Sequence, residues 1–200
     1  MTTPTHEALH GVLSETRMTN TFLGDVIEIC IVTADYQRTM EGLVRLGIGP
    51  WRVYTFSPEN TVDMRYRGEP AEFVIKVCFA RSSNVIWELM QPISGPTIFQ
   101  EFLDRHGEGV QHIAFDCGDI PLQEHIAEFG RRGFVPVQSG NWLGQNQFMF
   151  FGTQDAAGTV FETIYFPPDF EYPEPERWYP AAPAEVDDQV HSSGGAPPRE

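Results

Sequence analysis

The chain carries a strand-like segment twice. VIEICIVTAD at 26–35 returns in altered form as VQHIAFDCGD at 110–119, and the alignment places Glu28 opposite His112. Both segments are short, apolar and rich in β-branched residues, which is typical of buried strands. An internal repeat at this spacing predicts that the chain folds as two similar halves.

A second pair of segments repeats in the same order. VIWELMQP contains Glu88, and TVFETIYFP contains Glu162. Each half of the chain therefore places one candidate metal ligand in its first strand and another in its last. Two half-size modules that share one divalent-metal site would account for this symmetry.

The pattern of strands and helices between the two repeats is also duplicated, as strand, helix and three strands. The first module is expected to contain strands at 24–33, 50–56, 72–80 and 84–90, and a helix that starts after the N-cap Asp35 and ends near Leu46. The second is expected to contain strands at 109–117, 134–138, 146–152 and 159–165, and a helix at 121–132. The fold class predicted is α+β, with two βαβββ modules that form a metal-holding cleft.

The two ends of the chain differ in composition from its middle. The expected organisation is an N-terminal arm (1–22), a first module (23–93), a linking helix (94–107), a second module (108–168) and a Pro-rich acidic tail, partly disordered (169–200). Aromatic residues in the tail predict that its first part packs onto the domain. They are Phe170, Tyr172, Trp178 and Tyr179.

Charge and hydropathy exclude several classes of protein. The formal net charge is −15 and no basic cluster occurs, so a nucleic-acid backbone would be repelled. No apolar stretch approaches the roughly 20 residues that span a bilayer, and the N-terminus lacks an export signal, so a cytoplasmic protein without membrane contact is expected. Cys30, Cys78 and Cys117 lie scattered in apolar segments, as reduced thiols do. Cys30 could alternatively be a soft metal ligand beside Glu28.

Three carboxylates and one imidazole are expected in the apolar interiors of strands. Because side chains alternate along a strand, Glu28 shares its face with Cys30 and Val32. An unpaired buried carboxylate costs several kcal/mol, and too few basic residues lie nearby to neutralise all of them. A bound divalent ion would satisfy Glu28, Glu88, His112 and Glu162 together.

Lys76 is the one lysine of the chain and a further candidate. In AEFVIKVCFA the residues on one side of the strand are apolar, and Lys76 points to the other side, which is expected to be the cleft. There it could contact an anionic or enolate oxygen or donate a proton. The alternative is a solvated lysine at the edge of the sheet.

Aromatic side chains suggest an apolar pocket for a ring or an alkyl chain. The candidate substrate-binding residues are Trp51, Trp142, Phe148 and Phe150.

These segments resemble the vicinal oxygen chelate superfamily, which includes glyoxalase I, methylmalonyl-CoA epimerase, extradiol dioxygenases and bleomycin-resistance proteins. The resemblance covers residues 24 to 166 and rests on GEGVQHIAFDC, NVIWELMQP and TVFETIYFP. They place His112, Glu88 and Glu162 at three ligand positions. At the fourth position, Glu28 stands where epimerase-like members usually carry His, so it is either a ligand or a base.

For function, the resemblance implies one divalent metal (Mn²⁺, Mg²⁺, Zn²⁺, Co²⁺ or Ni²⁺) and frequently a homodimer. The metal would bind two neighbouring substrate oxygens and stabilise an enolate while a protein group moves a carbon-bound proton. Glu28, Glu162 and Lys76 are the candidate catalytic groups.

Three functions are compared. The leading hypothesis is a metal-dependent isomerase or epimerase, or a related lyase, that acts on a small carbonyl compound, aromatic or polyketide-like. An extradiol-type dioxygenase usually needs two His and one carboxylate around iron, and here one His lies at a ligand position. A metal-free protein that binds or sequesters a small molecule is the third, and it leaves the buried carboxylates unexplained.

Nucleophile-elbow, zinc-helix, P-loop and dinucleotide motifs do not occur in the sequence.

Overall fold

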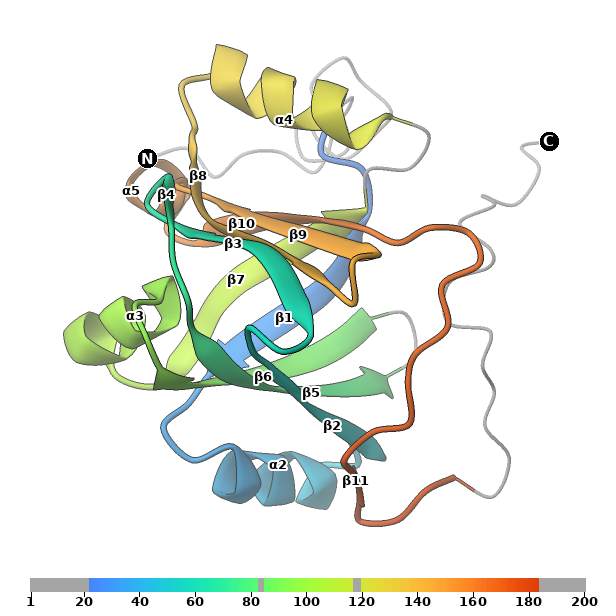
Figure 1. Cartoon of the computed structure of the whole chain (residues 1–200). Coiled ribbons are helices and arrows are strands. Elements are labelled where there is room, and N and C mark those ends of the chain that lie inside the picture. The colour runs from blue at the N-terminus through green and yellow to red at the C-terminus, as the bar shows by residue number, and fades with distance from the viewer. Residues whose placement is uncertain (1–21, 83–84, 117–119, 184–200) are drawn as a thin grey trace, which may run out of the picture.

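The computed structural model describes residues 22–82, 85–116 and 120–183. The strands in these ranges form one curved sheet of 11 strands, in the order β11-β2-β5-β6-β1-β7-β10-β9-β8-β3-β4 (Figure 1). The strands are β1 (Val26–Val32), β2 (Trp51–Phe56), β3 (Thr61–Tyr66), β4 (Glu69–Pro70), β5 (Val74–Ser82), β6 (Val85–Ser94), β7 (Gly109–Asp116), β8 (Pro136–Trp142), β9 (Asn146–Phe151), β10 (Val160–Tyr165) and β11 (Arg177–Tyr179). The helices are α2 (Tyr36–Arg45), α3 (Ile98–His106), α4 (Leu122–Arg131) and α5 (Gln154–Ala157).

The first and last strand of each module form the centre of the sheet. β1 runs parallel to β6, β7 runs parallel to β10, and β1 pairs with β7 in the antiparallel direction. The two halves are thus joined by backbone hydrogen bonds between their equivalent strands. The α+β architecture of two βαβββ modules, predicted from the repeat, is confirmed.

The chain between β2 and β5 forms a hairpin of β3 and β4, which was not expected from the sequence. β3 leaves the first half and pairs with β8 of the second, with Thr61 opposite Trp142 and Tyr66 opposite Gln138. Asp63 has a positive φ of 53° and the register shifts beside it, so apolar and polar residues do not alternate regularly here. A strand that depends on so distant a partner leaves little local signal.

β8 begins and ends later than the predicted 134–138. Its second half contains Ser139, Gly140 and Asn141, which are typical of turns. Gly140 is needed in the strand because a Cβ atom there would lie 2.5 Å from Cζ of Phe148. The glycine therefore marks close packing within the sheet rather than its end.

Helices α2 and α4 cover the outer side of the two halves of the sheet (Figure 1). Under α2, Met40 packs with Trp51 and Leu89 in one apolar cluster. Under α4, the ring of Phe129 stacks on Phe151 with a centroid distance of 3.7 Å. The inner, concave side of the sheet holds a second apolar cluster and is left free of these helices.

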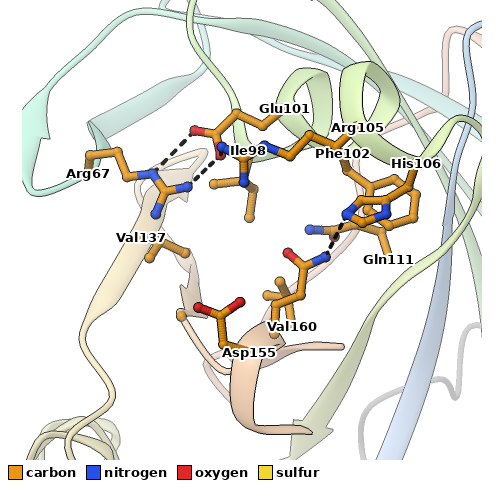
Figure 2. Close-up of a pocket in the computed structure, with 12 residues that line it drawn as sticks. Arg67, Ile98, Glu101, Phe102, Arg105, His106, Gln111, Val137, Asp155 and Val160 are labelled. Carbon is orange, nitrogen blue, oxygen red and sulfur yellow. Dashed lines mark hydrogen bonds and ion pairs between the residues drawn. The ribbon is translucent and has the colours of Figure 1, made fainter. Parts of the chain in front are cut away.

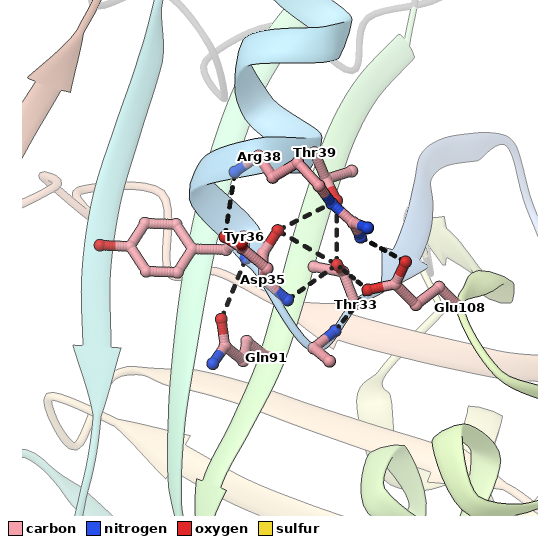
Figure 3. A network of polar contacts seen from close by, with 8 residues as sticks. Thr33, Asp35, Tyr36, Arg38, Thr39, Gln91 and Glu108 are labelled. Atoms are coloured by element: carbon pink, nitrogen blue, oxygen red, sulfur yellow. Dashed lines mark hydrogen bonds and ion pairs between the residues drawn. The ribbon is translucent and has the colours of Figure 1, made fainter.

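Glu108 connects the start of β7 to the turn between β1 and α2 (Figure 3). Its Oε1 accepts hydrogen bonds from Oγ1 of Thr33 at 2.8 Å and from the N–H of Ala34 at 2.9 Å. Its Oε2 pairs with Arg38. These contacts lower the pKa of Glu108 to about 2, chiefly through the Arg38 guanidinium. A polar network therefore ties the two modules together beside the β1–β7 pairing.

The C-terminal segment crosses the open side of the sheet and ends in β11, which pairs with β2. Nζ of Lys76 lies 2.7 Å from Oε2 of Glu176, and the Tyr54 hydroxyl donates to the carbonyl of Pro173 at 3.1 Å. The aromatic residues of the tail pack on the domain as predicted, with Phe170 and Tyr172 against the inner cluster. Most of the predicted arm and the disorder predicted for the end of the tail fall on residues 1–21 and 184–200, outside the described residues.

The limits of the predicted domains stay a prediction. Among the described residues, the helices are all too short or too polar to cross a membrane.

Candidate metal centre

Four neighbouring strands each supply one polar side chain to the inner side of the sheet. Glu88 lies on β6, Glu28 on β1, His112 on β7 and Glu162 on β10. Cys30 is the Cα partner of both Glu88 and His112, so these two side chains flank the same position of β1. Glu28 and Glu162 are level with Ala114 of β7, two residues along the sheet from Glu88 and His112, so the four residues occupy two adjacent levels on the inner side of the four central strands.

The four side chains converge on one point. One ligand atom from each of Glu28, Glu88, His112 and Glu162 lies within 4.8 Å of all the others. All four residues are at most 3% exposed. Nε2 of His112 lies 3.1 Å from Oε2 of Glu88 and 3.1 Å from Oε2 of Glu162. This is the group of residues that the repeat in the sequence singles out.

Two carboxylate oxygens in this group lack a hydrogen-bond partner within the described residues. They are Oε1 of Glu28 and Oε2 of Glu162. The latter lies 3.1 Å from Nε2 of His112, close enough for an ion pair, while the hydrogen bond of Nε2 is with Glu88. Buried, unpartnered oxygens are costly, and a divalent cation would satisfy both. Carboxylates with one imidazole are ligands that Mn²⁺, Mg²⁺, Zn²⁺, Co²⁺ and Ni²⁺ accept, so the residues present fit such an ion.

Protonation reflects the crowding of negative charge. Burial raises the pKa of Glu28 well above its usual value, and the carboxylates of Glu88 and Glu162 raise it further. Burial also raises the pKa of Glu162 to about 7, against the opposing effect of His112. For His112, burial lowers the pKa, but Glu162 and Glu88 outweigh it and raise the pKa to about 9. Protons bound to Glu28, Glu162 and His112 therefore reduce the repulsion among the carboxylates, which a bound metal cation would otherwise neutralise.

Cys30 lies at the edge of this group. Its sulfur forms a second cluster of possible ligands with Glu88 and His112. Burial and the nearby carboxylates raise the pKa of its thiol well above the usual value. Since metals bind the thiolate, this environment favours Cys30 as a packed thiol over a ligand.

A cavity of about 20 Å³ adjoins the three carboxylates. This volume holds a single water molecule or ion but not an organic substrate. Its other walls are mostly apolar and are formed by Phe56, Ile75, Phe79, Met90, Asn146, Phe148, Ile164 and Phe166.

Three of the four predicted substrate-binding aromatics lie on the inner side of the sheet. Phe148 lines the cavity. Phe150 presents its ring to that of His112 at a centroid distance of 4.9 Å. Trp142 stacks on Phe56, at 4.4 Å, and so lies behind the cavity wall.

Trp51 does not belong to this pocket, and the prediction for it is wrong. Its ring is fully buried under α2 on the outer side of the sheet, and its indole N–H donates to the carbonyl of Ile48 at 2.9 Å. The sequence shows the alternation of β2 but not which of its faces turns inward. The inner positions belong to Tyr54 and Phe56.

The predicted orientation of Lys76 is also wrong. Ile75 and Phe79 line the cavity, so the apolar side of β5 is the side that faces the cleft. Lys76 points outward, where it pairs with Glu176 and donates to Oγ1 of Thr55. The expectation assumed that a polar side of the strand faces the cleft, whereas the inner side of the sheet is largely apolar.

The predicted site residues did not include the aromatic cover from the C-terminal segment or Gln111. Phe166 lies in the cavity wall, and Phe170 and Tyr172 pack on it at centroid distances of 5.0 and 5.9 Å. The density of aromatics after residue 165 was a usable signal for this cover. Gln111 was missed because strict alternation would place it on the opposite side of the strand from His112.

Comparison with known proteins gives one family and a set of similar folds. The family model of the Glyoxalase/Bleomycin resistance protein/Dioxygenase superfamily matches residues 28–151. Among curated proteins, no sequence matches this chain.

Three similar solved structures each have a sequence identity to this chain of less than 25%. Methylmalonyl-CoA epimerase from Mycobacterium tuberculosis is 19% identical, with a TM-score of 0.53 over 75% of this chain and 93% of the epimerase. A hypothetical protein from Bacillus halodurans is 19% identical, with a TM-score of 0.52 over 74% of this chain and 98% of that protein. A variant of Streptomyces coelicolor methylmalonyl-CoA epimerase in complex with 2-nitronate-propionyl-CoA is 18% identical, with a TM-score of 0.50 over 76% and 99%. At this identity the likeness shows the fold alone.

Proposed function

The chain belongs to the Glyoxalase/Bleomycin resistance protein/Dioxygenase superfamily, and we propose on that basis that it is a metal-dependent isomerase or epimerase, or a related lyase. Its substrate is a small carbonyl compound with an apolar or aromatic part. The observation that carries this proposal is the convergence of three buried carboxylates and one imidazole within 4.8 Å of one another.

Glu88, His112 and Glu162 would hold one divalent metal ion, with Glu28 as a fourth ligand or as the base. When bound, the ion supplies a positive charge that polarises a substrate carbonyl and makes the neighbouring C–H more acidic. Each protein ligand comes from a central strand of the sheet, so the positions of the donor atoms are fixed by the backbone pairing. Such rigidity is what a catalytic metal site needs.

Glu28 is the best candidate to move the proton. Its Oε1 has no hydrogen-bond partner in the described part of the chain, and the side chain lines the cavity beside the other carboxylates. Its pKa is raised by burial, and a carboxylate with a raised pKa is a stronger base toward carbon acids. Oε1 of Glu28 would take the proton from one face of the substrate carbon to leave an enolate. A proton delivered to the opposite face, with Glu162 as the second carboxylate available for this role, would give the epimer.

The walls of the site favour a substrate with an apolar part. Phe79, Phe148 and Phe166 surround the carboxylates. The cavity of about 20 Å³ is too small for a carbonyl substrate, so the site has to open before one can bind, and the segment that begins at Phe166 is the proposed cover. Because a Streptomyces coelicolor epimerase was solved with a propionyl-CoA analogue, acyl-CoA thioesters belong in the set of compounds to test.

The two alternatives lead to different measurements. A sequestering protein of the same fold would bind its ligand without a stoichiometric metal. An extradiol-type dioxygenase would consume oxygen with a catechol, although the cluster in the described residues contains one histidine rather than two. The homodimer implied by the superfamily stays a proposal, which light scattering on the purified protein would test.

Elemental analysis followed by deuterium exchange tests the proposal. We expect about one divalent ion per chain and metal-dependent exchange of a carbon-bound proton in a panel of ketones and thioesters in heavy water. His112→Ala should lose both the metal and the exchange. The control is His106→Ala, at the exposed end of α3 and outside the cluster, which should keep both. Full exchange in metal-free His112→Ala protein would refute the proposal.

A further inference from the structure

Strand β7 contains one residue more than its partner β1 at the level of the site. Cys30 pairs with His112, but the next residue, Ile31, pairs with Val110, so Gln111 is the extra residue of a β-bulge. In a regular strand Gln111 and His112 would point to opposite sides of the sheet. A bulge re-aims side chains, and bulges occur frequently next to functional sites.

The bulge brings the side chain of Gln111 back to the ring of His112. Oε1 of Gln111 lies 2.6 Å from Nδ1 of His112, and the two residues are 3% and 0% exposed. An amide oxygen only accepts hydrogen bonds, so Nδ1 carries a proton and donates it. The other ring nitrogen, Nε2, is the one that faces Glu88 and Glu162 at 3.1 Å.

We propose that Gln111 is a positioning residue of the metal centre. It holds one proton of His112 on Nδ1 and the plane of the ring in place, so that Nε2 is the nitrogen that gives up its proton and turns its lone pair to the point where the carboxylates converge. This inference rests on the proposed function for its consequence, metal binding, but the hydrogen bond itself exists without the metal. Outer partners of this kind orient metal-binding histidines in general.

Gln111 is itself held through its backbone by the neighbouring strand segment. Its backbone carbonyl accepts a hydrogen bond from Oγ1 of Thr159, just before β10, at 2.9 Å. Its side chain forms part of the wall of a second cavity, of about 160 Å³, which also includes Arg67, Glu101 and His106 (Figure 2). Gln111 thus stands between this polar cavity and Nδ1 of His112.

Three variants separate positioning from general stability. Gln111→Leu keeps the size of the side chain and removes the acceptor, whereas Gln111→Glu keeps an acceptor at the same distance. Gln138→Leu is the matched control, because Gln138 is equally buried but its Oε1 accepts from the N–H of Ile98 instead. Calorimetric titration of each folded protein with Zn²⁺ and with Mn²⁺ gives the dissociation constants.

We expect Gln111→Leu to bind the metal about 10- to 100-fold more weakly than the unsubstituted protein. Gln111→Glu should recover most of that loss, and Gln138→Leu should bind as the unsubstituted protein does even if it melts at a lower temperature. Equal affinity in Gln111→Leu, or an equal loss in Gln138→Leu, would overturn the proposed positioning role.

A nitrogen-15 NMR spectrum of the His112 ring supplies a readout that does not depend on activity. In the metal-free protein we expect a protected Nδ1–H proton that disappears in Gln111→Leu and persists in Gln138→Leu. In the Zn²⁺ form only Nε2 should change its shift on binding. An unprotonated or freely exchanging Nδ1 refutes the role of Gln111. If the protected proton is present but no variant binds metal, the proposed function fails and the hydrogen bond stands.

Discussion

Nε2 of His112 lies 3.1 Å from Oε2 of Glu88, although one residue belongs to the second half of the chain and the other to the first. The contact exists because β1 separates β6 from β7 and presents the small side chain of Cys30 between them. A metal bound here would connect both halves of the sheet. Its binding free energy would therefore contribute to the stability of the whole domain.

Glu88→Gln should remove most of the stabilisation by metal. A ligand that binds the folded state at a concentration 1,000 times its dissociation constant adds about 4.1 kcal/mol to the free energy of unfolding. We expect the melting temperature of the unsubstituted protein to rise with Mn²⁺ or Zn²⁺ and that of Glu88→Gln to respond little. Differential scanning calorimetry with and without EDTA measures this. Glu124→Gln, an exposed change on α4, should respond as the unsubstituted protein does.

Glu108 should make stability depend on acid pH. Its pKa is lowered to about 2 in the folded state, so its contribution is present above the ordinary carboxyl pKa and is lost as the pH falls through about 2. The pair with Arg38 is solvent-exposed, so the contribution at neutral pH is only about 0.2–1 kcal/mol. Urea unfolding of Glu108→Gln should show this deficit at pH 7 and a smaller one near pH 2. Glu41→Gln, on the exposed side of α2, should show no deficit at either pH; an equal deficit there would contradict the assignment.

Glu176→Gln should loosen the segment that covers the cavity. The ion pair with Lys76 is partly exposed and contributes about 0.2–1 kcal/mol, which corresponds to at most about fivefold in an equilibrium constant. We expect KM for an active carbonyl substrate to fall by up to this factor, because less energy opposes the opening of the segment. Steady-state kinetics measures it, with Glu174→Gln, an exposed neighbour, as the control. An increase in KM would mean that the segment binds the substrate instead of excluding it.

Gly140→Ala should destabilise the protein. The added Cβ would lie 2.5 Å from Cζ of the buried Phe148, and overpacking of this kind costs about 1–3 kcal/mol. Gly130→Ala is the control of opposite sign, because a Cβ there meets nothing within 4 Å and alanine favours the helix by about 0.5–1 kcal/mol. Thermal unfolding of the two variants should shift in opposite directions. A neutral Gly140→Ala would show that Phe148 can move.

The duplicated segments carried much of the information about the site. Glu28, Glu88 and Glu162 each lie within an apolar strand-like segment, so the sequence predicted that these carboxylates are buried and in need of a partner. The repeat then indicated that the strands are equivalent in the two halves. The convergence of their side chains with His112 agrees with that interpretation.

Long-range pairing decided what the sequence left open. Alternation predicts that two sides of a strand differ, but which side faces inward depends on how the sheet curls, and this placed Trp51 and Lys76 outside. The bulge at Gln111 and the pairing of β3 with β8 depend on strands far along the chain, so no local sequence pattern predicts them. The sequence by itself therefore determined the modules and the set of candidate polar residues in their strands. Only the tertiary structure decided which neighbours orient those residues and which segment covers them, because these depend on contacts between distant strands.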